Sequence, residues 1–126
     1  MLRAELQNEK IESFRELHVW QRAMQLANVI YDITLAFPKE EAFGLSSQMR
    51  RAAVSIASNI AEGSQRGKKE FAQFVIIARG SNAELLTQLI LAQDRKYIDA
   101  QHYTKAYALI DEVSRMSMRL IQSLKK

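Results

Sequence analysis

The sequence predicts an all-α protein, an antiparallel up-down four-helix bundle. In four long segments, apolar residues recur at three- and four-residue steps, which places them on one face of a helix. Only one proline and four glycines occur in 126 residues, so breaks between helices are few. No segment alternates apolar and polar residues over the length of a strand. We expect the bundle over residues 14–126, after an N-terminal extension, residues 1–13, that lacks strong periodicity.

The first predicted helix runs from about Leu17 to Ala36. It ends at Phe37 because the next residue, Pro38, disfavours helical geometry in the residue that precedes it. A short acidic connector then leads to Gly44, which separates this helix from the following one.

The second predicted helix begins near Ser46 or Ser47 and ends at Gly63. Either serine hydroxyl can accept a hydrogen bond from the free amides of a first helical turn. Gly63 is the expected C-cap, because glycine adopts the left-handed backbone conformation without steric cost.

The third predicted helix begins after Gly67 and extends to about Arg95, and the fourth is capped by Asp99 and continues nearly to Lys126. The connections between all four helices are short. Short connections are typical of bundles in which neighbouring helices run antiparallel.

The first and third helices carry more than one apolar stripe, whereas the fourth has a single clear stripe. One stripe suffices for a helix of an isolated bundle. A second stripe either widens the core or exposes an apolar patch that monomers generally avoid. We favour the latter, and hence a ring-like homo-oligomer. The residues expected at its interface are Val19, Leu26, Ile33, Ala72, Ile76, Arg79, Ala83, Leu86 and Ile90.

Gly80 and Arg79 stand out inside the third helix. A glycine within a helix costs about 1 kcal/mol relative to alanine, and close approach of another backbone, within the bundle or between subunits, explains it best. Arg79 interrupts an apolar stripe. It requires a carboxylate, such as Glu84 or a partner-chain residue, or a solvent-filled channel. The alternative is an arginine whose head group simply reaches water.

Basic residues gather toward both ends of the predicted bundle. The net charge of +4 and the pI of about 9.5 come from 18 basic and 14 acidic residues. This weak excess permits a polyanionic partner, bound with release of counterions, although charged runs are usually plain solvated surface. A ring of subunits would multiply each basic cluster. The candidate nucleic-acid-binding residues are Arg50, Arg51, Arg66, Lys68, Lys69, Arg79, Arg95 and Lys96.

The sequence offers little for catalysis or metal binding. It contains no cysteine, which excludes disulfides, zinc–thiolate sites and thiol nucleophiles. Asp99 and His102 have the spacing of one half of a bundle di-iron site, but no second pair exists. We therefore expect no enzymatic activity, no cofactor and no metal. No signal-peptide core and no apolar run of about 20 residues is evident, so the expected compartment is the cytoplasm, without a membrane partner.

Short motifs at fixed spacing mark the first three helices and their connections. They are Leu17-His18-Val19-Trp20-Gln21-Arg22-Ala23, Phe37-Pro38 with Glu41, Phe43-Gly44-Leu45, Gln48, Arg50-Arg51-Ala52, Ser55-Ile56, Ser58-Asn59-Ile60-Ala61-Glu62-Gly63, Glu70-Phe71, Ala78, Gly80-Ser81 and Glu84-Leu85. On these residues the chain resembles a bacterial family, the four-helix bundle proteins linked to 23S ribosomal RNA intervening sequences. The resemblance extends from about Phe14 to Lys125.

The resemblance implies a left-handed bundle that assembles as a homopentamer around an axial channel, without enzymatic activity. Similar bundles serve as accessory proteins of diversity-generating retroelements, where they contact a reverse transcriptase and nucleic acid. Two hypotheses follow. The protein is either a basic oligomeric ring that binds RNA or DNA, or a protein–protein scaffold without direct nucleic-acid contact.

Overall fold

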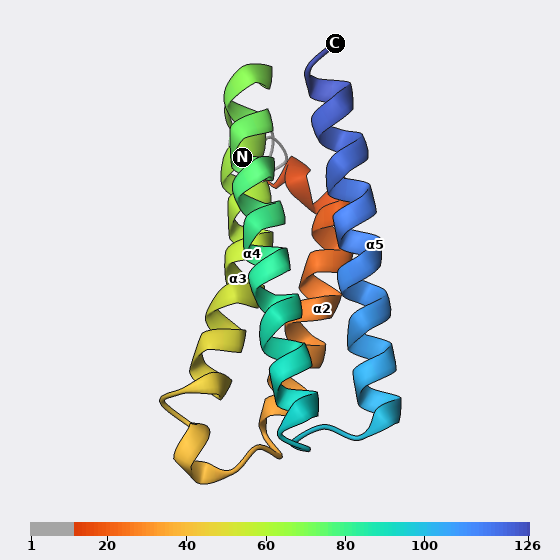
Figure 1. Cartoon of the computed structure of the whole chain (residues 1–126). Helices are drawn as coiled ribbons and strands as arrows, with labels where there is room; N and C mark the ends of the chain where they lie inside the picture. Colours follow the sequence, from red (N-terminus) through yellow and green to blue (C-terminus); the bar gives the residue numbers. More distant parts are fainter. Residues whose placement is uncertain (1–11) are drawn as a thin grey trace.

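The computed structural model describes residues 12–126, which form four long helices and two short 3-10 helices and contain no strand (Figure 1). The prediction of an all-helical chain is confirmed for this part of the protein. Of the predicted extension, residues 1–13, the part up to residue 11 lies outside the described residues. The elements are η1 (Ser13–Glu16), α2 (His18–Thr34), η2 (Lys39–Glu41), α3 (Leu45–Ser64), α4 (Lys68–Asp94) and α5 (Ala100–Leu124).

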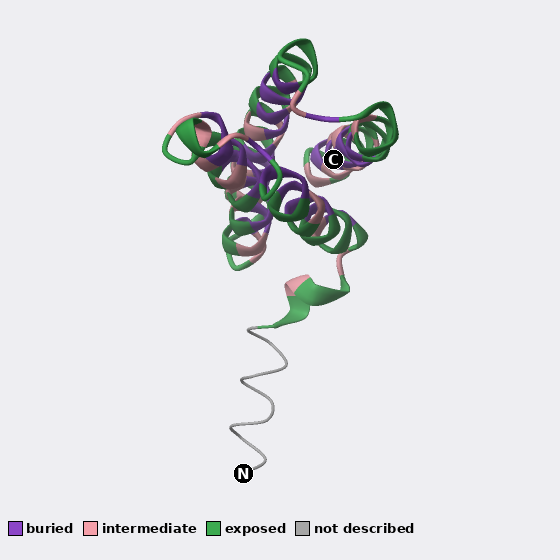
Figure 2. Cartoon of the chain, turned by 90° about the horizontal axis from the view of Figure 1, so that it is seen from below, coloured by how far each residue is buried: buried purple, intermediate pink, exposed green. Residues whose placement is uncertain are grey.

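The four long helices lie side by side and enclose one core. Each helix contacts the next one in the chain, and α2 also contacts α5. The amino end of α3 and the carboxyl end of α4 meet at one end of the molecule, where Leu45 and Arg95 line the same hollow. A view along the helices shows the buried residues on their inner sides (Figure 2). Among the side chains without solvent exposure are Leu26, Ile30, Met49, Ile56, Ile60, Leu85, Leu89 and Val113.

The amino end of α3 differs from the prediction. The helix begins at Leu45, with Gly44 at the N-cap, and neither Ser46 nor Ser47 caps it. Instead, Oε1 of Glu41 accepts a hydrogen bond from the Leu45 amide at 3.2 Å. The cap therefore comes from the preceding connector, and Ser46 is buried in the first turn of the helix.

The prediction that Gly63 is a C-cap is wrong, because α3 continues through it to Ser64. The C-cap residue is Gln65, in the right-handed helical conformation. A Cβ atom on Gly63 would lie 2.6 Å from Cβ of Phe74 and 3.0 Å from Cδ1 of Phe71. The glycine therefore permits close packing of α3 against α4.

The carboxyl end of α4 is a Schellman turn built on a lysine. The Tyr97 amide donates to the Ala92 carbonyl and the Lys96 amide donates to the Gln93 carbonyl, both at 2.9 Å. Lys96 has a φ of 64° and is the one non-glycine residue with positive φ in the described chain. Glycine is the usual residue at this position, since a side chain there is strained.

The predicted cap of α5 is confirmed. Asp99 precedes the helix, and its Oδ1 atom accepts a hydrogen bond from the His102 amide at 2.8 Å. This hydrogen bond is the main reason why the pKa of Asp99 lies below its ordinary value.

Helix α4 carries apolar residues on more than its core-facing side. By length and composition it is the one described helix that could cross a membrane, and a third of its most apolar window is buried. Any 18-residue window of α4 includes Arg79, Asn82 and Glu84, so this is a high average hydropathy and not an uninterrupted apolar run. A core helix of a soluble protein passes the same test, so the finding describes the composition of α4 and not its surroundings.

Candidate functional site

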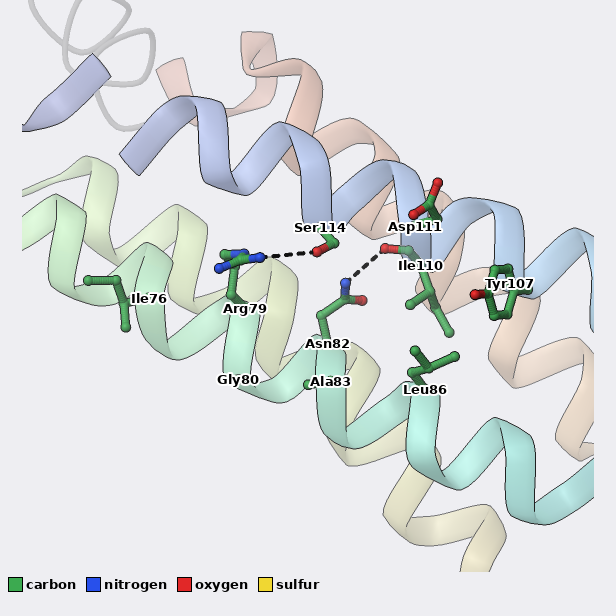
Figure 3. Close-up of a pocket in the computed structure, with 10 residues that line it drawn as sticks. All are labelled: Ile76, Arg79, Gly80, Asn82, Ala83, Leu86, Tyr107, Ile110, Asp111 and Ser114. Carbon is green, nitrogen blue, oxygen red and sulfur yellow. Dashed lines mark hydrogen bonds between the residues drawn. The ribbon is translucent and has the colours of Figure 1, made fainter. Parts of the chain in front are cut away.

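A groove of about 400 Å³ lies between α4 and α5 (Figure 3). Most of its walls are apolar, but arginine, asparagine, serine and aspartate side chains also line it. The lining residues are Ile76, Arg79, Gly80, Asn82, Ala83, Leu86, Tyr107, Ile110, Asp111 and Ser114. Four of them were predicted from the sequence as interface residues, and they come from the second apolar stripe of α4.

Arg79 is half-buried in this groove and has no carboxylate partner within residues 12–126. It donates one hydrogen bond, from Nη2 to Oγ of Ser114 at 3.4 Å, and its Nε is buried without a partner. The ion pair with Glu84 suggested by the sequence is not formed. Asp111, the only acidic residue that lines the groove, pairs with Arg115 at 3.0 Å. A positive charge therefore remains without a counter-charge in an apolar groove.

Asn82 holds the two walls of the groove together. Its Nδ2 atom donates to the Ile110 carbonyl at 2.9 Å, and the residue is only 2% exposed. Its Oδ1 atom is buried and has no hydrogen-bond partner in the described chain. A buried carbonyl oxygen in this condition is uncommon, and a donor from outside the chain would satisfy it.

The outer face of α4 continues the groove. Five residues on it are spaced by four, three, four and three positions, the heptad spacing of helices that pack against each other. They are Ile76, Gly80, Ala83, Thr87 and Ile90, and we call them the α4 seam. Ile76 and Ile90 are 40% and 41% exposed. A Cβ atom on Gly80 would meet nothing within 4 Å, so the explanation of Gly80 by close approach within the bundle is wrong.

Four of the predicted interface residues belong to the core of the single chain. Val19, Leu26, Ile33 and Ala72 are all buried. The extra stripe of α2 therefore widens the core, which was the alternative explanation, because α3 and α5 both pack against this helix. On α4 the outcome differs: Ile76, Ala83 and Ile90 are exposed, and Leu86 is half-buried.

The basic residues at the α3–α4 turn differ in their surroundings. Arg66 forms ion pairs with Glu62 at 3.6 Å and Glu70 at 3.2 Å, and its guanidinium lies 5.3 Å from the ring centre of Phe74. Lys68 and Lys69 begin α4, are exposed, and form no ion pair with the described residues. The positive charges of these two lysines are therefore available to bind an anionic ligand.

At the opposite end of the molecule, Arg51 and Arg95 both lie beside Gln48. Interaction with the Tyr97 hydroxyl raises the pKa of Arg95 further above its ordinary value. Lys96 is exposed and occupies the strained position after α4. The structure thus brings Arg51, Arg95 and Lys96 into one region, as expected where the start of α3 meets the end of α4.

A second hollow, of about 580 Å³, lies between α2 and α3, and Arg50 is one of its lining residues. Its lining consists of Tyr31, Ala42, Phe43, Ser47, Arg50, Arg51, Val54 and Ser55. Sequence reasoning did not single out Tyr31 or Phe43 as functional residues. The signal that could have found Phe43 is an aromatic residue in a polar connector, where no core is available to bury it.

Within residues 12–126, no group of three or more histidine, cysteine, aspartate or glutamate residues could hold a metal ion. Nδ1 of His102 lies 2.7 Å from Oδ1 of Asp99, and this contact belongs to the cap of α5.

The architecture and surfaces define an all-helical bundle protein with one exposed apolar helix face and charged ends. The sequence model of the 23S rRNA-intervening sequence protein family matches residues 15–119, and the chain belongs to that family. The resemblance found in the sequence is thus confirmed. A solved structure of a protein of unknown function from the S23 ribosomal protein family, from Bacteroides thetaiotaomicron, has the same fold. The two chains are 22% identical with a TM-score of 0.75, over 82% of this chain and 95% of the other. A comparison with curated proteins finds no match.

Proposed function

We propose that the protein is a non-enzymatic, cytoplasmic homo-oligomer that binds RNA or DNA through basic surface residues. Its subunit is an antiparallel up-down four-helix bundle, and the subunits form a ring. The observation that carries the proposal is the α4 seam, an exposed apolar helix face with heptad spacing. The family resemblance implies five subunits.

The α4 seam is suited to contact with a helix of a second copy. Isoleucines lie at its two ends, and between them are the small residues Gly80 and Ala83 and the polar residue Thr87. Small residues let two helix backbones approach closely, and Gly80 has no such neighbour within its own chain. Its cost of about 1 kcal/mol relative to alanine is offset if another subunit packs there.

Arg79 supports the same assembly. Its half-buried guanidinium lies beside the seam without a carboxylate partner in the described chain, and full burial of an unpaired charge in an interface would be strongly unfavourable. An acidic residue of a neighbouring subunit would satisfy it. A contact between two different surfaces of identical chains closes into a ring when the rotation permits.

Assembly into a ring would multiply the small net charge of each subunit. Each subunit adds a net charge of +4, and phosphate binding with counterion release grows with the number of basic contacts. The charges available for such contacts include Lys68 and Lys69, at the amino end of α4, where free amides add to the attraction for phosphate.

Light scattering after size exclusion tests both parts of the proposal. We expect a mass several times the 14.4 kDa of one chain, and a further shift with bulk RNA at low salt that high salt abolishes. Replacing Lys68 and Lys69 by glutamine should weaken the shift. The matched control is the double variant Arg15→Gln with Arg22→Gln, which also removes two charges, at residues already paired with Glu12 and Glu112. A monomer contradicts the oligomer, and a ring indifferent to RNA contradicts nucleic-acid binding.

The alternative is a scaffold that recruits another protein without touching nucleic acid. A third hollow, of about 610 Å³, between α3 and α4 favours it. This hollow contains Leu91, which is 49% exposed, and Gln88, whose buried Oε1 has no partner in the described chain. A native pull-down that recovers a second protein with a ring indifferent to RNA would support this alternative.

A further inference from the structure

We propose that the hollow between α2 and α3 binds an unpaired nucleobase, with Phe43 as the stacking surface and Arg50 and Arg51 as the phosphate contacts. This inference rests on the nucleic-acid part of the proposed function. It specifies the form of nucleic acid that is recognised, a single-stranded segment, and the residues that recognise it.

Phe43 is 99% exposed, although phenylalanine is among the residues most often buried. It lies in the connector after η2, directly before the N-cap residue Gly44, and takes no part in the core. Its ring is therefore free on both faces. A ring in this position is suited to stacking on an unpaired base, which is how many proteins bind single strands.

Arg50 carries a fixed positive charge at the back of the same hollow. Its Nε donates to Oγ1 of Thr34 at 2.8 Å, and its guanidinium lies 4.8 Å from the ring centre of Tyr31. These contacts hold the arginine without neutralising it. A preoriented guanidinium binds an anionic group with little loss of conformational freedom.

Arg51 supplies a second charge at the rim. It is exposed, lines the hollow, and forms no ion pair or hydrogen bond with the described residues. None of the eight residues that line the hollow is acidic. The charge of the hollow therefore suits a phosphate, and the aromatic rings beside it suit a base.

The size and position of the hollow agree with this ligand. Its volume of about 580 Å³ lies within the roughly 300–1,000 Å³ usual for ligand sites. A second copy of the chain is a poorer occupant if it docks through the groove between α4 and α5. That contact would bring Arg79 toward Arg50 and Arg51, and like charges across an interface are unfavourable.

Fluorescence anisotropy with a labelled oligouridine of about 12 nucleotides tests the inference, with an RNA duplex of the same length as the second probe. Phe43→Leu keeps an apolar side chain but removes the ring. We expect it to weaken single-strand binding roughly 5- to 100-fold and to leave duplex binding nearly unchanged. Phe43→Trp should retain single-strand binding. Leu35→Ala removes another exposed apolar side chain, one that is 77% exposed and outside the hollow, and should have no effect.

Salt titration separates the role of the aromatic residue Phe43 from that of the basic residue Arg51. Phe43→Leu should leave the salt dependence of binding unchanged, whereas Arg51→Gln should weaken binding to both probes and reduce the salt slope by about 1. Circular dichroism checks that each variant remains folded.

Three results would overturn the inference, and they are distinguishable. If Phe43→Leu binds both probes like the wild type, base stacking is absent while the polyanion function stands. If the wild type binds neither probe, the nucleic-acid part of the proposed function fails as well. If Phe43→Leu changes the mass measured by light scattering, the hollow is a contact between subunits.

Discussion

Glu41 and Tyr97 join the two connectors at one end of the molecule. The Tyr97 hydroxyl donates to Oε2 of Glu41 at 3.0 Å, while Oε1 accepts a hydrogen bond from the Leu45 amide at 3.2 Å. One carboxylate thus caps α3 and binds the residue that follows α4. The ring of Phe37 packs on Tyr97 with centres 5.4 Å apart.

Removing the carboxylate should destabilise the fold. We expect Glu41→Ala to lower the free energy of unfolding by about 1–3 kcal/mol, because it removes a helix cap and leaves a hydroxyl without its partner. Tyr97→Phe should cost less, about 0.5–1.5 kcal/mol, since the cap remains. Urea unfolding measures both values. Equal stability of Glu41→Ala and wild type would show that the carboxylate does not cap α3.

Replacing each of the two helical glycines by alanine should change the stability of the subunit in opposite directions. Gly63→Ala places a Cβ atom 2.6 Å from Phe74, so we expect a loss of about 1–3 kcal/mol. Gly80→Ala meets nothing within 4 Å and should stabilise the subunit by about 1 kcal/mol, while it weakens assembly through the α4 seam. Unfolding followed by light scattering separates the two effects. Unimpaired assembly of Gly80→Ala would mean that no helix approaches this glycine.

Glycine at position 96 should stabilise the protein. The φ of 64° at Lys96 is strained for any residue with a side chain, and relief of this strain is worth about 1 kcal/mol. Thermal unfolding should show a higher Tm for Lys96→Gly and no comparable gain for Lys96→Ala, which serves as the control. The glycine variant also removes a candidate nucleic-acid contact, so weaker RNA binding with higher stability would assign both roles to Lys96.

Acid should weaken the cap of α5. The pKa of Asp99 is lower in the folded protein than its ordinary value, chiefly because the carboxylate accepts the His102 amide. The folded state therefore favours the ionised form. Its contribution to stability is present above the ordinary pKa of about 4 and is lost as the pH falls through the depressed value. Asp99→Asn should show a smaller loss of Tm below about pH 4, and an unchanged pH profile would contradict this role.

A charge on the α4 seam should prevent assembly. Ile76→Asp or Ile90→Asp is expected to reduce the mass in light scattering to that of one 14.4 kDa chain while most helix content remains. Both side chains are partly exposed in the single subunit, so the core is not disturbed. Met24→Asp, at a residue of α2 that is 37% exposed, is the control and should assemble normally. A wild-type protein that is monomeric at micromolar concentration would refute the interface.

The helices and several of their ends could be predicted because the signals are local. Asp99 caps α5 as expected, whereas α2 ends at Thr34, slightly before the end near Ala36 that Pro38 predicts. Gly63 was misread because glycine has two uses, a left-handed cap and close packing, and only the position of Phe74 distinguishes them. The cap of α3 was misassigned to serine because Glu41 approaches the helix from outside it.

The surfaces were less predictable because periodicity identifies a face without saying what covers it. Leu26 and Ile76 both lie on second stripes, yet Leu26 is buried by neighbouring helices and Ile76 is exposed. The contact of Arg79 with Ser114 joins residues 35 positions apart, and the pairing of α4 with α5 had to be known first. The position of Phe43 in the lining of the same hollow as Tyr31 and Arg50 likewise depends on how the connector turns.

The contact between Glu41 and Tyr97 can form only late in synthesis of the chain. The two residues are 56 positions apart, so at roughly 5–20 residues per second the ribosome needs about 3–11 s to deliver the second after the first. During that interval α3 and α4 are synthesised, while α5 and the Tyr97 hydroxyl that completes the junction are still missing. The faces of α2 and α4 that pack against α5 are still uncovered when Tyr97 is added, so the fold closes only near the end of translation.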